Sequence, residues 1–256
     1  ADFPEMRYIL TLQESVAVMT ADGFARANRA PALVQLHSSP GIGNAVGALY
    51  QAKRGHAPLV CIGGDAGVRY TAMDAQMAAD LVAMMEPVTK WSTVVLEPSS
   101  LLRILRRAVK IASTPPMGPV YVCLPQDVLD AVVTEEVFPT SHVSTRVTPA
   151  PETVAVMADL LLAGKKPMIF VGDAVAYSDA QHELEKVAEL LGAEVWEADA
   201  GEVNIRYDHP LYMGMTGHMF GSSSLPIMQK GDVILVVGTY LLPEKLADGL
   251  RAHRER

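Results

Sequence analysis

The sequence predicts an α/β protein built from two three-layer α/β/α domains with mainly parallel sheets. Two observations indicate this fold class. Short apolar runs rich in branched residues alternate with helical segments along most of the chain, an order typical of parallel sheets covered by helices. The length of 256 residues and the apolar content of 50% are sufficient for two domains, each with its own core.

The first domain is expected over residues 1–130. A helix over 11–29 comes first, and Pro31 ends it. Branched apolar runs then mark buried strands, and segments with apolar residues at helical spacing lie between them. The expected strands are 32–37, 57–63 and 119–124, and the expected helices are 43–54, a stretch within 66–92 that Pro87 breaks, and one that begins at Pro98.

Residues 131–150 contain several prolines and follow no sustained period, which indicates a linker. A second series of alternating segments over 151–256 indicates a second α/β domain. Both ends of the chain interrupt the pattern, so we expect a fragment that is clipped at each end. The expected helices of the second domain are 151–163 and 179–191, its expected strands are 167–172, 193–198 and 232–238, and a loop is expected near 208–224.

The composition argues against several classes of protein. The net charge of −8 disfavours non-specific binding of nucleic acid. No apolar run approaches the length needed to span a membrane, and no signal peptide is recognisable. Cys61 and Cys123 lie inside apolar runs, as is typical of buried, reduced thiols. We therefore expect a cytoplasmic protein with neither nucleic acid nor membrane as a partner.

The first candidate functional residue is His37, which ends an apolar run at the expected carboxyl end of a strand. Ligands of open α/β sheets bind at that edge. Residues 38–44 follow as a predicted tight turn, in which Gly41 and Gly43 would let a ligand approach the backbone closely. A structural histidine beside a simple corner would give the same pattern.

Glu14 is the second candidate. Helical spacing from Glu14 reaches Val18, Ala21 and Ala25, so its carboxyl group is expected on or beside the buried face of the first helix. A carboxylate there is costly unless it is paired, and the pKa of Glu14 is expected to rise as water is excluded. A buried glutamate paired with a backbone amide or an arginine is the structural alternative.

These residues resemble a known family. The segments LQESVAVMTADGFAR and LHSSPGIGNAVGAL are similar to the pyrimidine-binding domain of thiamine-diphosphate-dependent decarboxylases and carboligases, most of all to the benzoylformate decarboxylase branch. The resemblance continues through APLVCIGGD, PVTKWS and GPVYVCLPQD. It extends into the central domain of that family through PMIFVGDAV, DHPLYMGMTG and GDVILVVG.

The resemblance implies roles for individual residues. Glu14 would hydrogen-bond the aminopyrimidine ring of thiamine diphosphate and assist removal of the thiazolium proton. His37 would transfer protons to and from the covalent intermediate, a role that suits the pKa of an imidazole. Gly41, Gly43 and Asn44 would lie beside the pyrimidine ring. A helix cap is an equally good interpretation of Asn44.

The resemblance also implies partners that lie outside this chain. A third, carboxyl-terminal domain of the family binds the diphosphate through Mg²⁺ with a Gly-Asp-Gly turn and a downstream asparagine. The nearest segment here is Gly172-Asp173-Ala174 with Asn204, which we interpret as a turn at a strand end. The family acts on 2-oxo acids as homo-oligomers. This fragment alone is expected to be inactive and to bind the cofactor weakly, with no metal site of its own.

Two other functions stay open at this point. An acetolactate-synthase-like carboligase shares the same scaffold, although such enzymes usually lack a histidine at the place of His37. A non-catalytic α/β module for binding or oligomerisation would keep the fold without the chemistry.

Among the other candidate residues, Lys90 is interpreted as a solvated or structural cation. His209 and His218 have a spacing that fits no compact zinc motif.

Overall fold

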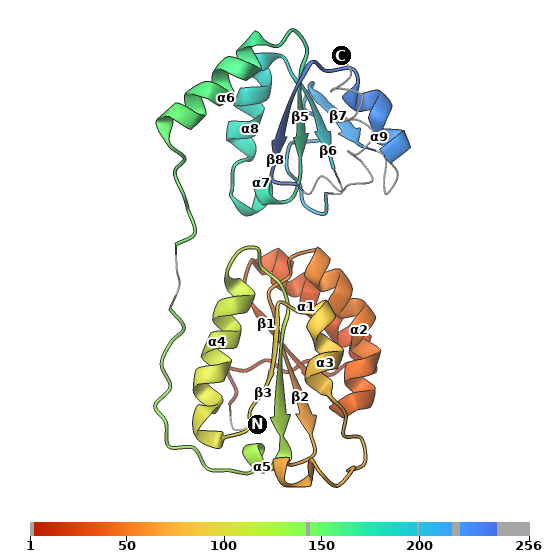
Figure 1. Ribbon diagram of the computed structural model, residues 1–256, viewed down its shortest axis with the longest axis vertical. Helices are drawn as coiled ribbons and strands as arrows, with labels where there is room; N and C mark the ends of the chain where they lie inside the picture. The colour runs from red at the N-terminus through yellow and green to blue at the C-terminus, as the bar shows by residue number, and fades with distance from the viewer. Residues whose placement is uncertain (1–2, 142–143, 199, 217–220, 240–256) are drawn as a thin grey trace. The chain divides into compact units, whose positions relative to one another are not determined.

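The computed structural model describes residues 3–141, 144–198, 200–216 and 221–239 (Figure 1). The chain divides into two compact units, Ala1–Arg146 and Val147–Arg256. Each unit has one sheet of four parallel strands with helices on both faces. The predicted fold class, two three-layer domains with parallel sheets, is therefore confirmed.

The sheet of the first unit has the strand order β1-β2-β4-β3. Its four strands are β1 (Ala32–Leu36), β2 (Leu59–Asp65), β3 (Trp91–Val94) and β4 (Val120–Pro125). Every residue of β4 is buried, as expected for a continuous apolar run in the interior of a parallel sheet. In β1, by contrast, buried and exposed residues alternate. The side chains of Leu33 and Gln35 therefore lie next to solvent.

Helices cover both faces of this sheet. One core cluster joins the sheet to α1 (Glu14–Asn28), α2 (Ser38–Arg54) and α3 (Leu81–Met85). A second cluster joins the other face to α4 (Leu101–Ser113), which lies on the opposite side in Figure 1. The short helix α5 (Gln126–Leu129) follows β4. Single 3₁₀ turns occur at Val68–Tyr70, Glu86–Val88 and Pro98–Ser100.

The prediction for the segment after β1 was wrong in one respect. The tight turn expected over 38–44 is the start of α2, which begins at Ser38 instead of 43. Pro40 is tolerated because the first backbone N–H groups of a helix have no acceptor within it. Apolar residues on the buried side, such as Ile42 and Ala45, hold this first part of the helix against the core.

The stretch 66–92 also differs from the prediction. Only α3 and two 3₁₀ turns form there, because most side chains over 69–80 are exposed and offer no apolar face that could stabilise a long helix. Strand β3 was missed, since its four residues include Ser92 and Thr93 and form no apolar run. The hydrogen bonds of its pairing with β4 stabilise the strand instead of a local apolar pattern.

The second unit has the strand order β7-β6-β5-β8. Its strands are β5 (Pro167–Val171), β6 (Glu194–Glu197), β7 (Tyr212–Met215) and β8 (Val233–Val237). Its helices are α6 (Pro151–Ala163), α7 (Ala174–Tyr177), α8 (Gln181–Leu191) and α9 (Gly221–Met228). Strand β7 and the first part of helix α9 lie within the segment 208–224, where a loop was expected. One core cluster lies between the sheet and α8, and a smaller one surrounds Phe170 and Met228.

The segment between α5 and α6 has no regular secondary structure in its described residues, 130–141 and 144–150. Two arginines of α4 contact its first part. Arg103 forms an ion pair with Glu135 at 3.1 Å, and the guanidinium of Arg106 lies over the ring of Phe138. Within the described part of the chain, no helix is long and apolar enough to cross a membrane.

The buried thiols give a testable prediction. Burial raises the pKa of Cys61 to about 12 and that of Cys123 to about 11, so the reactive thiolate form is scarce at neutral pH. We expect a disulfide reagent at pH 7.5 to leave both cysteines of the native protein unmodified and to titrate both after unfolding in urea. Rapid native reaction of either thiol would contradict the buried positions.

Candidate functional site

The candidate site lies at the start of two helices in the first unit. Glu14 is the first residue of α1, and the side chain of Gln13 caps this helix by accepting hydrogen bonds from the backbone N–H groups of Ser15 and Val16. A negative charge in the first turn is favoured by the positive end of the helix dipole. The cap was not predicted, because glutamine is not among the usual capping residues.

Glu14 contacts α2 through two residues of the predicted set. The amide Nδ2 of Asn44 donates a hydrogen bond to Oε2 of Glu14 at 3.1 Å. The other carboxylate oxygen, Oε1, lies above Gly41, where a Cβ atom would come within 2.9 Å of it. Any side chain at Gly41 would therefore displace the carboxylate. The structure brings Glu14, Gly41 and Asn44 together, although they are 27 and 30 positions apart in the sequence.

The electrostatics of Glu14 differ from the prediction. The pKa of Glu14 lies below its ordinary value, chiefly because of the hydrogen bond from Asn44, with smaller contributions from its own backbone N–H and the charge of His37. The expected rise in pKa is therefore wrong for this chain. The side chain is half-buried, since it sits at the open end of the helix, and its desolvation does not outweigh these favourable contacts.

His37 is exposed and stands directly before α2. The next residue, Ser38, has a φ of 43°, in the left-handed region that residues other than glycine seldom adopt. Such strain is typical of positions that the surrounding structure holds for a purpose. The hydroxyl of Ser39 donates a hydrogen bond to the carbonyl of Met77 at 2.7 Å and ties this corner to the loop before α3. Neither feature has a signal in the sequence.

For Gly43 and Asn44, the structure does not support one interpretation that was made from the sequence. Gly43 is exposed, and a Cβ atom there would meet only the methyl group of Met84 at 3.8 Å, an ordinary contact that does not require glycine. The proposed capping role of Asn44 is wrong, because α2 begins at Ser38 and Asn44 lies beyond its first turn. Its side chain contacts α1 instead.

Lys90 has a structural role, which is one of the two roles foreseen for it. Its Nζ donates hydrogen bonds to the carbonyls of Ile111 and Thr114, at 2.6 and 2.7 Å, and so satisfies groups at the carboxyl end of α4. The partial burial of Lys90 lowers its pKa. The lysine therefore stabilises the first unit away from the candidate site.

The segment Gly172-Asp173-Ala174 is a turn between β5 and α7, as predicted. Its carboxylate accepts hydrogen bonds from the backbone N–H groups of Gly201 and Glu202, at 2.8 and 3.0 Å. Asn204 is fully buried. Its Oδ1 accepts a hydrogen bond from the backbone N–H of Ala176, and its Nδ2 donates one to Oε1 of Glu197. Both side chains hold loops of the second unit in place.

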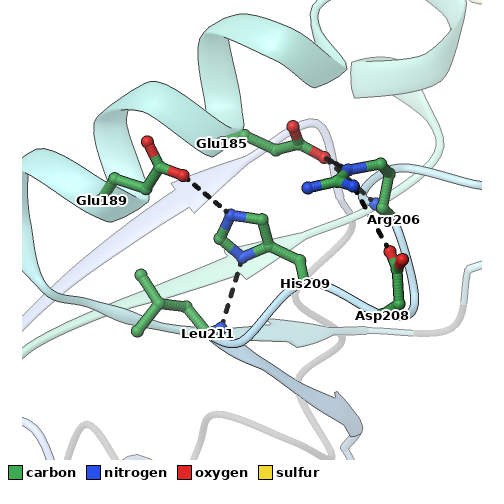
Figure 2. Close-up of polar contacts among 6 residues, drawn as sticks. All are labelled: Glu185, Glu189, Arg206, Asp208, His209 and Leu211. Atoms are coloured by element: carbon green, nitrogen blue, oxygen red, sulfur yellow. Dashed lines mark hydrogen bonds and ion pairs between the residues drawn. The ribbon is translucent and has the colours of Figure 1, made fainter.

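His209 is also structural (Figure 2). Its Nδ1 accepts the backbone N–H of Leu211 at 3.3 Å, so Nε2 carries the hydrogen that faces the carboxylate of Glu189, also at 3.3 Å. Arg206 beside it pairs with Glu185 at 3.0 Å. His218 lies outside the described residues. Nowhere in the described ranges do three or more histidine, cysteine or acidic side chains form a group able to hold a metal ion.

Two protein-family models match the chain. The N-terminal TPP binding domain of thiamine pyrophosphate enzymes matches residues 1–84, and the central domain of thiamine pyrophosphate enzymes matches residues 154–247. The first match contains every residue of the candidate site. The second covers most of the second unit.

Individual relatives give the same result. The chain is 34% identical to benzoylformate decarboxylase of Pseudomonas aeruginosa, over 93% of this chain and 46% of the relative. It is 30% identical to the large subunit of acetolactate synthase isozyme 1 of Escherichia coli, over 91% of this chain and 42% of the relative. The crystal structure of benzoylformate decarboxylase from Polynucleobacter necessarius superposes with a TM-score of 0.85 at 31% identity, covering 97% of this chain and 48% of that one. The chain thus spans about half the length of the curated relatives it matches.

The contacts of His209 predict a loss of stability on substitution. We expect His209→Gln to lower the free energy of unfolding of the second unit by about 1–3 kcal/mol, because the flexible amide of glutamine does not reproduce the fixed geometry of a buried ring with two hydrogen bonds. The measurement is urea unfolding followed by the fluorescence of Trp196 in a Trp91→Phe background.

His182→Gln is the matched control, because His182 is an exposed histidine of α8. It should leave the transition unchanged. Equal transitions for both variants would show that the hydrogen bonds of His209 contribute nothing to stability.

Proposed function

Because the chain belongs to the thiamine pyrophosphate enzymes, we propose that it is part of a thiamine-diphosphate-dependent 2-oxo acid decarboxylase similar to benzoylformate decarboxylase. One observation carries this proposal. The carboxylate of Glu14 is held by Asn44 directly above a glycine, at the end of a sheet where α/β proteins bind ligands. In this proposal a flat heterocycle binds beside this carboxyl group, and its ring nitrogen shares a proton with it.

In this proposal, each residue of the candidate site has a separate role. Glu14 hydrogen-bonds the aminopyrimidine ring and exchanges a proton with it. The absence of a side chain at Gly41 leaves room for the carboxylate of Glu14 against the backbone, and Gly43 and Asn44 complete the wall of the site. The exposed imidazole of His37 holds or moves a proton on the substrate side. When bound, the cofactor supplies a carbon nucleophile and a sink for the electrons released with carbon dioxide.

We propose that other parts of the intact protein complete the active site. A magnesium ion would hold the diphosphate, and no described group of residues is suited to bind it. We propose that these ligands lie in a further domain and that the active protein is a cytoplasmic homo-oligomer, as the family resemblance implies. The substrate is a 2-oxo acid. The present chain by itself is expected to bind the cofactor weakly and to be inactive.

A second candidate is an acetolactate-synthase-like carboligase, because the chain is nearly as similar to acetolactate synthase as to benzoylformate decarboxylase. His37 favours the decarboxylase. The two reactions differ in their products from one substrate. With pyruvate, a decarboxylase releases acetaldehyde, whereas a carboligase forms a 2-hydroxy-3-oxo acid, and proton NMR of the reaction mixture separates them. The visible absorbance of a bound flavin in the purified protein would also favour the carboligase.

We expect Glu14→Gln in the intact protein to lower the rate of 2-oxo acid decarboxylation by about a hundredfold or more at saturating cofactor, because an amide cannot exchange the proton. The fold should persist, since the site is half-buried. Steady-state kinetics and circular dichroism measure the two effects. Glu152→Gln, which changes an exposed glutamate at the start of α6, is the matched control and should be fully active. Full activity of Glu14→Gln would support a non-catalytic module, and its unfolding would support a merely structural glutamate.

His37→Ala in the intact protein is expected to reduce kcat by about a hundredfold with little change in the affinity for thiamine diphosphate. The reason is that His37 is exposed at the corner of β1 and α2 and influences Glu14 through its charge, whereas the hydrogen bond from Asn44 holds the carboxylate in place. Calorimetric titration of the cofactor separates the two quantities. Loss of cofactor affinity with unchanged kcat would instead assign His37 to binding.

A further inference from the structure

The contact between Asn44 and Glu14 has a use beyond holding two helices together. We propose that Asn44 is a positioning residue: its amide occupies Oε2 of Glu14 and thereby directs the exchangeable proton of the carboxyl group to Oε1, the oxygen above Gly41. This inference rests on the proposed function for the identity of the proton acceptor. The contact between Asn44 and Glu14 lies within this chain and does not depend on that function.

The geometry supports the assignment in two steps. First, Nδ2 of Asn44 donates to Oε2 at 3.1 Å, so this oxygen acts as an acceptor. In a neutral carboxyl group the carbonyl oxygen is the better acceptor, and the hydrogen is carried by the other oxygen. Second, the other oxygen, Oε1, packs against the backbone of Gly41, where a Cβ atom would come within 2.9 Å of it, and it is not the oxygen that Asn44 contacts. The exchangeable proton is therefore left on the oxygen that the amide of Asn44 does not occupy.

The backbone of Asn44 is well anchored for this task. Asn44 lies in the interior of α2, between residues that belong to the main core cluster, Ile42 and Ala45. Its side chain, in contrast, is exposed and extends to the first residue of α1. A rigid helix thus carries the amide, and the capped start of α1 carries the carboxylate. An amide at this place also cannot titrate, so its hydrogen bond persists across the working pH range.

The same contact sets the proton affinity of Glu14. The amide of Asn44 and the nearby charge of His37 both favour the carboxylate and hold the pKa of Glu14 below its ordinary value. His37 is the titratable side chain that faces Glu14 from the corner of β1 and α2, and the backbone N–H of Glu14 itself acts from α1. Removing the amide would leave the backbone N–H and the charge of His37 to oppose desolvation, which raises the pKa of Glu14. The pKa of Glu14 would then rise.

The experiment measures this pKa directly, without cofactor. Protein labelled with ¹³C at the glutamate carboxyl groups is titrated by NMR, and the Glu14→Gln variant assigns the resonance. We expect an upward shift of the Glu14 pKa in Asn44→Ala, where the donor is lost. A larger upward shift is expected in Asn44→Asp, where a second carboxylate replaces the donor. Gln51→Ala removes an exposed amide from the same helix and should leave the pKa unchanged.

An unaltered Glu14 pKa in both Asn44 variants would overturn the proposal and leave Asn44 with a contact to the cofactor or none. Circular dichroism verifies folding. If Asn44→Ala does not fold, Asn44→Ser replaces it, because the serine side chain is shorter and no longer reaches Glu14. In the intact protein, the acidic limb of the pH profile of kcat/KM should move upward with the measured pKa. A shifted pKa without any thiamine-dependent activity in the unmodified protein would refute the proposed function and retain the positioning role.

Discussion

The packing of α1 against α2 is the constraint on which the candidate site depends. Both helices bury small and branched residues in one core cluster with β1, and this fixes the distance between their first turns. Glu14 and Asn44 are exposed or half-buried at that place, so neither contributes to the core. Their contact is a consequence of the packing underneath them. A site of this kind obtains its geometry from apolar residues that never touch a ligand.

The electrostatic character of the site follows from its position at a helix start. The start of α1 offers the backbone N–H of Glu14 itself, α2 offers an amide, and the adjoining corner offers an imidazole. All three favour a negative charge on Glu14. A ligand that covers the site would exclude water and would oppose this preference. The carboxyl group is thus balanced between two influences, which suits a residue that must gain and lose a proton.

The sequence alone was sufficient for the fold class, for most strands and for the pairing of Glu14 with the corner at His37, because hydrophobic period and strand ends are local signals. It was insufficient for three features. The start of α2 depends on how Pro40 is placed within a helix turn, and β3 depends on pairing with β4. The burial and pKa of Glu14 depend on Asn44, a contact across 30 positions that no local pattern encodes.

The left-handed backbone of Ser38 limits how this corner can vary over evolutionary time. Glycine, asparagine or aspartate would adopt the same dihedral angle at little cost, whereas valine or isoleucine would clash with its own main chain. A branched residue there would have to relax toward ordinary helix geometry and would turn the end of β1 with it. The imidazole of His37, which precedes it, would then point elsewhere, so a substitution at Ser38 would change the candidate site without altering any of its polar side chains.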